Sequence, residues 1–494
     1  MNSIEKEESM AISHQGPVPE TGQHDGSAPE ANHLSHGMST RQITMMSLGT
    51  AIGTGLFVGS AAGIGIAGPA IVISYAIAGV LLIFVMRMLG EMAAAHPSSG
   101  SFSTYAEKAL GKAGGATIGW VWWFQMMMVA AIESVVAGGF LAGWTGLPQW
   151  LMTLVILLAF TGVNMFQVSR FGELEFWFAS IKVAAVIAFL VIGIVAVAGL
   201  IGPGSPGLTN ISEHGGVFPN GVTGMFAGLL AVIFSFGGIE VVALAAAESN
   251  DPGRNIQKAV RNVVWRILLF YVGSMAIMVL VLPWNSFDAG DDSPGPFVQV
   301  LSQIGLPYAD IIMQIIIMVS LLSALNATLY AASRMAYSLS SRGQAPRLLQ
   351  KVGTNGVPRV AVVASSLVGL VVVLLSFFGQ QVFMSLLSAV GSTLIILFCT
   401  VTISHIILRR RYESSGDTRE LPFKMWAFPY LSWITLGALL LIIAMLLANS
   451  ATRAPLLMLL AITAVIALCC VWHNRGNNKS PLGNTLFPPE DSSR

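Results

Sequence analysis

Charged residues are scarce in this sequence of 494 residues. Asp, Glu, Lys and Arg make up 10% of it, whereas a soluble domain has about 25% charged residues. Hydrophobic residues make up 54%, and apolar runs of about 20 residues, each long enough to span a bilayer, recur along almost the whole chain. The composition therefore excludes soluble protein classes and predicts an integral membrane protein with many spans. The chain also lacks the basic block expected of a protein that binds nucleic acid.

The residue clusters that carry most enzyme chemistry are missing as well. We find no group of His, Cys and carboxylates with metal-ligand spacing, no phosphate-binding P-loop and no nucleophile triad. The three cysteines, Cys399, Cys469 and Cys470, lie in apolar segments and show no disulfide pattern. We therefore expect no enzymatic activity, no metal and no cofactor. No cleavable signal precedes the first apolar segment, because residues 1–38 are polar and predict a disordered cytoplasmic tail.

Apolar run lengths predict about twelve membrane-spanning helices with no soluble domain between them. The first two spans are separated only by Gly68 and Pro69, a turn dipeptide. Residues 476–494 are expected to form a short cytoplasmic tail. The expected limits of the spans are 43–67, 69–94, 116–143, 149–168, 177–201, 223–249, 262–283, 309–340, 358–378, 381–408, 427–449 and 454–473.

Lys and Arg are almost absent from every second connection between the predicted spans. Only Arg453 lies on that side, and the remaining connections and both tails carry nearly all the basic residues. The positive-inside rule therefore places both termini in the cytoplasm and makes the number of spans even. On the basic side, residues 97–112 begin with capping residues and predict a short amphipathic helix at the membrane surface. The connections without Lys or Arg are those near 144–148, 202–222, 284–308 and 379–380.

Glycines interrupt the first apolar segment at residues 49–59, GTAIGTGLFVG, where a membrane helix should run unbroken. Glycine weakens a helix interior, and unwound backbone at this depth is tolerated only inside protein or along a cavity. A helix broken here would turn free amides and a positive helix end toward the cavity, which suits a carboxylate or a similar anion. The alternative is a seam of small residues that lets two helices pack closely.

A second glycine interruption lies in the sixth predicted span, at residues 234–240, FSFGGIE. If spans 1–5 and 6–10 are two related halves, the interruptions occupy corresponding positions, which is the best sequence indication of a transporter site. The first would offer amides to an anionic group, and the second would offer free carbonyls to a cationic group. A ligand with both charges, an amino acid, fits the pair. Two unrelated glycine kinks in long helices are the alternative.

At these interruptions the sequence resembles the amino acid permeases, in the bacterial amino acid transporter branch of the amino acid–polyamine–organocation superfamily. The resemblance covers about 39–475, and residues 241–249, VVALAAAES, are most similar to γ-aminobutyrate permeases. The matching motifs are GTAIGTGLF at 49–57, GEM at 90–92, FGELEFWF at 171–178, FSFGGIE at 234–240, SRM at 333–335 and RGQAP at 342–346.

This resemblance implies an all-α, LeuT-like fold for the twelve-helix transport domain. It implies two inverted five-helix repeats, about 43–201 and 223–408, in which helices 1 and 6 are broken, followed by two extra helices within 427–473. It also implies uptake coupled to protons.

The resemblance further implies roles for single residues. Lys182 matches a lysine that substitutes for the sodium ion of sodium-coupled relatives, and the alternative is a lysine that extends to the cytoplasmic interface. Backbone N–H groups of the first interruption are expected to hold the substrate carboxylate, and backbone carbonyls of the second to face its amino group. The residues concerned are Thr50, Gly53, Thr54 and Gly55 in the first, and Phe234, Ser235 and Gly237 in the second.

Two carboxylates inside the predicted spans complete the candidate site. Glu240 would cost about 2.5–3.5 kcal/mol if it faced lipid, so we expect it to face the interior with a partner or a proton and to couple protons or gate the site. The alternative is a structural carboxylate bonded to amides of the broken first helix. Glu133 is the one charged residue in the third span, and it could read the far end of the substrate or help proton transfer. A hydrogen bond between helices is the alternative for Glu133.

The sequence thus predicts a proton symporter that imports an amino acid, γ-aminobutyrate or another neutral one, across the inner (cytoplasmic) membrane by alternating access. Its expected partners are the amino acid, the proton and the lipid bilayer, with no obligatory protein partner. An exchanger of the same fold is the main alternative. An amino-acid sensor would normally need a large soluble extension, and a channel would show a hydrophilic pore lining.

Overall fold

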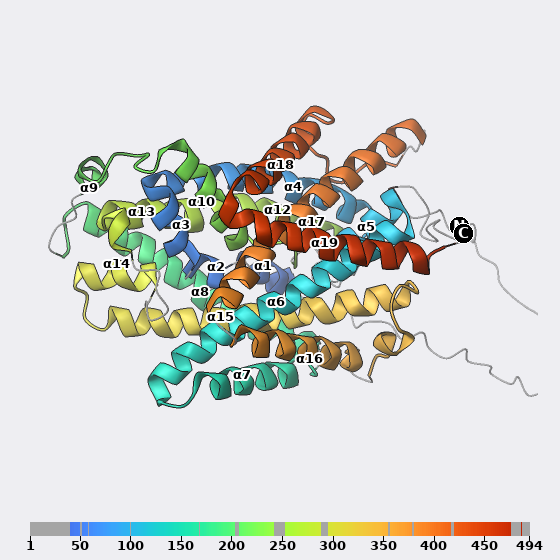
Figure 1. Cartoon of the computed structure of the whole chain (residues 1–494), viewed down its shortest axis with the longest axis horizontal. Helices are drawn as coiled ribbons and strands as arrows, with labels where there is room; N and C mark the ends of the chain where they lie inside the picture. Colours follow the sequence, from blue (N-terminus) through green and yellow to red (C-terminus); the bar gives the residue numbers. More distant parts are fainter. Residues whose placement is uncertain are drawn as a thin grey trace, which may run out of the picture.

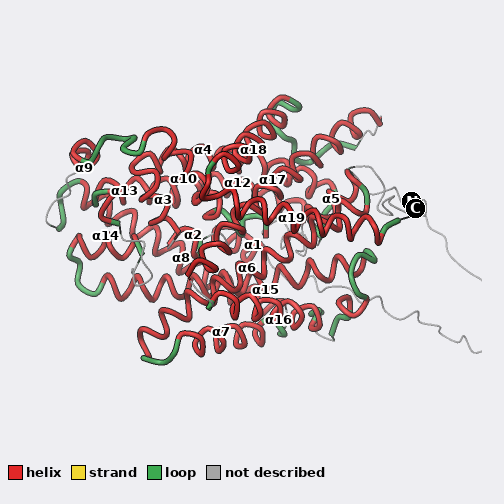
Figure 2. Tube along the Cα trace, viewed as in Figure 1, coloured by secondary structure: helices red, strands yellow, loops and turns green. Residues whose placement is uncertain are grey.

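The structure is a computed structural model, and its described part is built from helices, with no strand among the described residues (Figure 2). The long apolar runs explain this, because a helix pairs its own backbone groups where lipid offers no partners. The described residues are 40–49, 52–57, 59–98, 100–166, 168–202, 207–241, 252–287, 295–353, 356–377, 380–415, 419–475 and 486.

The first half of the chain contributes ten labelled α-helices to the described structure. They are α1 Thr40–Gly49, α2 Thr54–Phe57, α3 Gly59–Ala67, α4 Ile71–Ala95, α5 Ser101–Leu110, α6 Lys112–Thr145, α7 Gln149–Val163, α8 Val168–Val197, α9 Leu208–Glu213 and α10 Gly221–Ser235.

The second half follows with helices of similar length, and a π-helical segment, Ile267–Gly273, joins two of them. The helices are α12 Pro252–Arg266, α13 Ser274–Val281, α14 Pro296–Ile304, α15 Ala309–Ser341, α16 Arg359–Ser376, α17 Gln380–Ser415, α18 Tyr430–Ala448 and α19 Ser450–His473.

Eight stretches of the described chain are long and apolar enough to cross a membrane, and α7 and α16 are shorter apolar helices. The first stretch, Gly59–Ala95, contains the 3-10 turn Gly68–Ala70, where Gly68 has a φ of 63° that favours glycine. This turn lies at the dipeptide that the sequence predicts as the boundary between two spans. Twelve spans and two inverted repeats, within the boundaries given above, stay predictions.

The long helices α6 and α15 pack along each other through the middle of the molecule, and α7 and α16 pack on α6 (Figure 1). The C-terminal helices α18 and α19 are the least buried of the eight candidate spans. Figure 1 also shows that α9, α14 and the connection from α6 to α7 lie at the left end, whereas α5 and the connection from α15 to α16 lie at the right end. Three of the connections without basic residues and two of those that carry them therefore lie at opposite ends of the molecule.

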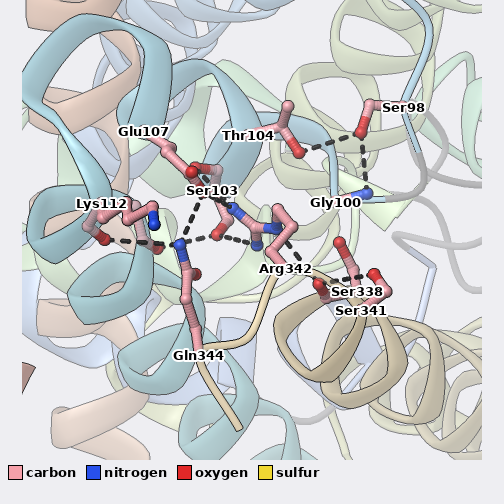
Figure 3. Close-up of polar contacts among 11 residues, drawn as sticks. Ser98, Gly100, Ser103, Thr104, Glu107, Lys112, Ser338, Ser341, Arg342 and Gln344 are labelled. Atoms are coloured by element: carbon pink, nitrogen blue, oxygen red, sulfur yellow. Dashed lines mark hydrogen bonds and ion pairs between the residues drawn. The ribbon is translucent and has the colours of Figure 1, made fainter. Parts of the chain in front are cut away.

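The predicted helix within residues 97–112 forms, but its predicted location at the membrane surface is wrong. This helix, α5, is almost fully buried and packs against α6 and α17. Its Glu107 carboxylate accepts hydrogen bonds from Arg342 Nη1 (2.7 Å) and Gln344 Nε2 (2.6 Å), both just after α15, and Arg342 also donates to Ser103 Oγ at 2.8 Å (Figure 3). These hydrogen bonds compensate for the burial of the polar face of α5, which the sequence analysis predicts to be exposed.

Candidate substrate site between two interrupted helices

The first helix is interrupted where the sequence analysis expects it. Helix α1 ends at Gly49, Ile52 and Gly53 are not helical, and α2 begins at Thr54. Gly53 lies close to two other helices, because a Cβ there would be 3.1 Å from Glu133 Oε1 on α6 and 3.2 Å from the Ala324 Cβ on α15. Glycine thus allows this backbone to approach its neighbours. Thr50 lies outside the described residues.

The Glu133 carboxylate is buried beside this interruption, and its Oε1 accepts the backbone N–H of Thr54 at 3.4 Å. A protein carboxylate therefore pairs with the first amide of α2, one of those expected to bind a substrate carboxylate. The first amides of a helix have no partner within it, and one of them is paired here with an anionic group of the protein itself. Binding of a substrate carboxylate at this backbone stays a prediction. The contact joins α2 to α6, as the alternative for Glu133 supposed.

The second helix is interrupted after Ser235, where α10 ends and residues 236–240 form a turn. Gly238 has a φ of 93°, a conformation that glycine adopts most readily. Gly237 is half-buried in this turn. Phe234 lies in the last turn of α10, and its side chain lies outside the described part of the structure.

Ser235 joins the two interruptions directly. Its buried hydroxyl donates to the Gly55 carbonyl at 2.7 Å and forms a second hydrogen bond, of 2.9 Å, with the Tyr75 hydroxyl. Its backbone carbonyl accepts the Tyr271 hydroxyl at 3.1 Å. Tyr75 and Tyr271 stack with ring centroids 5.9 Å apart. Both interrupted helices therefore meet in one buried polar junction. In it, side-chain hydroxyls donate hydrogen bonds to the backbone carbonyls of Ser235 and Gly55.

Lys182 on α8 lies at the C-terminal end of α1. Its Nζ donates to the Gly49 carbonyl at 2.6 Å and lies 3.9 Å from Glu175 Oε1, and both side chains are completely buried. The Ser323 hydroxyl on α15 donates to the same Glu175 oxygen at 2.7 Å. A cation at this position faces the partial negative charge of a helix C-terminus. The Lys182 side chain therefore does not extend to the cytoplasmic interface, which was the alternative for this residue.

Glu240 is buried at the end of the second interruption, and its Oε1 accepts the indole N–H of Trp122 on α6 at 3.1 Å. It faces the protein interior and has a partner there, as the cost of exposing it to lipid requires. The Trp122 side chain is itself fully buried and packs edge-on against Phe102 of α5, with ring centroids 5.1 Å apart. Glu240 thus connects the second interruption to α6.

The family described as amino acid permease matches residues 42–479 of the sequence. The chain belongs to the amino acid permease family. The permease is 42% identical to the γ-aminobutyric acid permease of Bacillus subtilis, in a match that covers 88% of this chain and 92% of that protein. It is 43% identical to the aromatic amino acid transport protein AroP of Corynebacterium glutamicum, over 85% and 91% of the two chains. It is 36% identical to the L-asparagine permease of Salmonella typhimurium, over 83% of each chain.

The family confirms the resemblance on which the sequence analysis depends. The permease is a multi-pass membrane protein that transports amino acids, and its relatives are named as permeases and transport proteins, not as enzymes. The names of these relatives differ in the amino acid that they specify.

Sequence reasoning missed several residues of this region in the permease. Glu175 precedes Lys182 by seven residues, or two helical turns, so spacing alone could have placed both on one face of a helix. Tyr75, Tyr271 and Trp122 had no comparable signal, because their partners lie more than 30 residues away in sequence. Lys182 lies at the C-terminal end of α1, whereas Glu240 bonds to Trp122 at the end of the second interruption, so the two residues hold different ends of the two interruptions.

Proposed function

We propose that this permease imports a neutral amino acid across the inner membrane by proton symport, with both termini in the cytoplasm. The substrate binds between the two interruptions, with its carboxylate on amides of Thr50, Gly53, Thr54 and Gly55. Its amino group faces carbonyls of Phe234, Ser235 and Gly237. One bundle of helices rocks against the rest, so that the site opens to each side in turn.

The observation that carries the proton coupling is the buried contact of Lys182 with the Gly49 carbonyl at 2.6 Å. The ammonium ties the end of α1 to α8 with a charge-assisted hydrogen bond, which is about twice as strong as a neutral one. Loss of the proton weakens this tie and frees α1 to move relative to α8. Glu175, 3.9 Å from the amine, is placed to exchange that proton.

Glu240 is the second group that we propose for coupling or gating. Its contact with Trp122 joins the second interruption to α6, so a change in its charge alters that link. Glu133, on α6 beside Thr54, is placed to compete with the substrate carboxylate for the same amide or to read a distant ammonium. A γ-amino acid carries its ammonium further from its carboxylate than an α-amino acid does. We therefore propose γ-aminobutyrate as the first candidate, since a relative of that name is 42% identical.

The test is uptake into proteoliposomes that contain the purified permease. The panel includes γ-aminobutyrate, the aromatic amino acids and asparagine, each with and without an inward proton gradient. We expect gradient-driven accumulation of one of them. Lys182→Met and Glu240→Gln should abolish accumulation while substrate binding persists, because each variant removes a titratable group and keeps the size of the side chain. Ser180→Ala serves as the control, since the one hydrogen bond of the Ser180 hydroxyl to the described residues stays within α8, at the Phe176 carbonyl.

Uptake that requires internal amino acid and ignores the proton gradient would make the permease an exchanger. The roles given to Lys182 and Glu240 would then be wrong. Binding of an amino acid without any transport would favour a sensor.

A further inference from the structure

A cavity of about 570 Å³, lined by residues outside the two interruptions, lies between α4, α12 and the connection from α17 to α18. Four basic side chains line it, and no acidic residue is among the described residues of its lining. The basic residues are Arg87 on α4 and Arg254, Lys258 and Arg261 on α12. We refer to it as the basic cavity.

The wall formed by the α17–α18 connection is fixed by two residues one turn apart on α4. Arg87 Nε donates to the Lys424 carbonyl at 2.8 Å, and the Glu91 carboxylate accepts the backbone N–H of Met425. The Arg87 guanidinium also lies 4.3 Å from the Phe423 ring centroid and 3.9 Å from that of Trp426. Contacts with α4 therefore fix the position of Phe423 and Trp426, which form the aromatic wall of the basic cavity.

The three basic residues of α12 lie on one face of this helix, because they are spaced by four and then three positions. Lys258 and Arg261, three positions apart on this face, repel each other as like charges. An anion that accepts several hydrogen bonds at once would relieve this repulsion, and phosphate oxygens suit both guanidinium and ammonium donors. The chemistry of the lining thus suits a phosphate group.

Two tryptophans place the basic cavity at the level of lipid headgroups. Trp265 and Trp426 line it and remain 63% and 48% exposed, and exposed tryptophans gather at the membrane–water interface. Ile83, Val260 and Val264 add apolar surface to the same lining. Cationic pockets between membrane helices at this level bind anionic headgroups. We propose that the basic cavity binds the phosphate headgroup of an anionic phospholipid, with its acyl chains along the apolar part of the lining.

The test uses the full-length protein in detergent and counts bound phosphatidylglycerol by native mass spectrometry. Each basic residue near an anionic surface strengthens binding by about fivefold, so the double variant Lys258→Gln/Arg261→Gln should weaken binding about 30-fold. The matched control is Arg347→Gln/Lys351→Gln, which removes the same charge from two exposed residues outside the basic cavity. We expect it to bind like the unchanged protein.

A charge-keeping variant, Lys258→Arg/Arg261→Lys, separates loss of charge from loss of fold and should retain binding. Phosphatidylcholine and inorganic phosphate, added at the same concentration as the phosphatidylglycerol, should not displace it. The proposal would be overturned if Lys258→Gln/Arg261→Gln and the control variant lost phosphatidylglycerol binding equally. Full binding by Lys258→Gln/Arg261→Gln, or loss of binding by the charge-keeping variant, would also overturn it. Displacement by inorganic phosphate would show an anion site that does not select lipid. These outcomes do not depend on substrate or on proton coupling.

Discussion

Two glutamates on α8, only two residues apart, differ in their burial and in their partners. Glu175 is fully buried beside Lys182 and Ser323, whereas Glu173 is about half exposed and pairs with Arg41 at 3.2 Å. An exposed ion pair contributes about 0–1 kcal/mol, but a buried charge that loses its partner costs several times more. The same substitution should therefore have very different effects at the two positions.

Glu175→Gln should lower the free energy of unfolding by about 3 kcal/mol, because it leaves the buried Lys182 ammonium without its carboxylate neighbour. The measurement is thermal unfolding of the purified protein in detergent at constant pH. Glu173→Gln is the matched control and should change the stability by less than about 1 kcal/mol. Equal effects of the two variants would show that Glu175 and Lys182 do not act as a pair.

At the scale of helices, the contact between α1 and α8 depends on a small residue on each side. A Cβ at Gly49 would lie only 2.4 Å from the Cβ of Ala179, so an alanine there would push the two helices apart. The same contact brings the Gly49 carbonyl to Lys182. Helix separation should therefore affect transport as well as stability.

Gly49→Ala should cost about 1–3 kcal/mol of unfolding free energy through overpacking and should reduce proton-driven uptake. The exchange Gly49→Ala/Ala179→Gly removes the contact with the Ala179 methyl group, but the added Cβ would still lie 2.8 Å from the Cα of residue 179, so we expect it to recover only part of the uptake. Gly369→Ala on α16 is the control, because a Cβ there meets no atom within 4 Å. It should leave uptake unchanged, since alanine is the better helix former. If the exchange variant took up as little substrate as Gly49→Ala alone, the clash with the Ala179 methyl group would not be the cause of the reduced uptake.

The π-helical segment Ile267–Gly273 shows how an element can serve a site that lies far away in sequence. It contains Tyr271, whose hydroxyl binds the Ser235 carbonyl at the end of α10. Local π-helical turns are often found at functional sites. This segment and the turn after Ser235 therefore form one polar junction, in which two irregular backbones lie next to each other.

At the scale of the whole molecule, the distribution of basic residues predicts which end faces the cytoplasm. The cysteine variant Glu213→Cys lies on α9, in a connection without Lys or Arg, and Arg347→Cys lies in the connection from α15 to α16 at the opposite end. In intact cells, a membrane-impermeant maleimide should label Glu213→Cys at once, and Arg347→Cys only after permeabilisation. Both positions are exposed. The unchanged protein, with three cysteines, is the control for background labelling. The reverse labelling pattern would invert the proposed orientation.

The sequence by itself determined the membrane class, the amino acid permease family and the places of the two interruptions. These properties depend on local signals: apolar run length, and glycines where a helix should continue, as at Gly53 and Gly238. A local signal is present in a single segment and needs no partner to be recognised. The family match adds the transported class of compound, because the matched family is described as amino acid permease.

Only the tertiary structure decided which groups meet. It placed the Lys182 amine on the Gly49 carbonyl, the Ser235 hydroxyl on the Gly55 carbonyl, and the supposed surface helix α5 in the interior. These contacts join residues 133 and 180 positions apart in the first two cases. Helical periodicity gives the face on which a side chain lies, but not what packs against that face. Burial and pairing of polar groups therefore emerge only when all the helices have packed together.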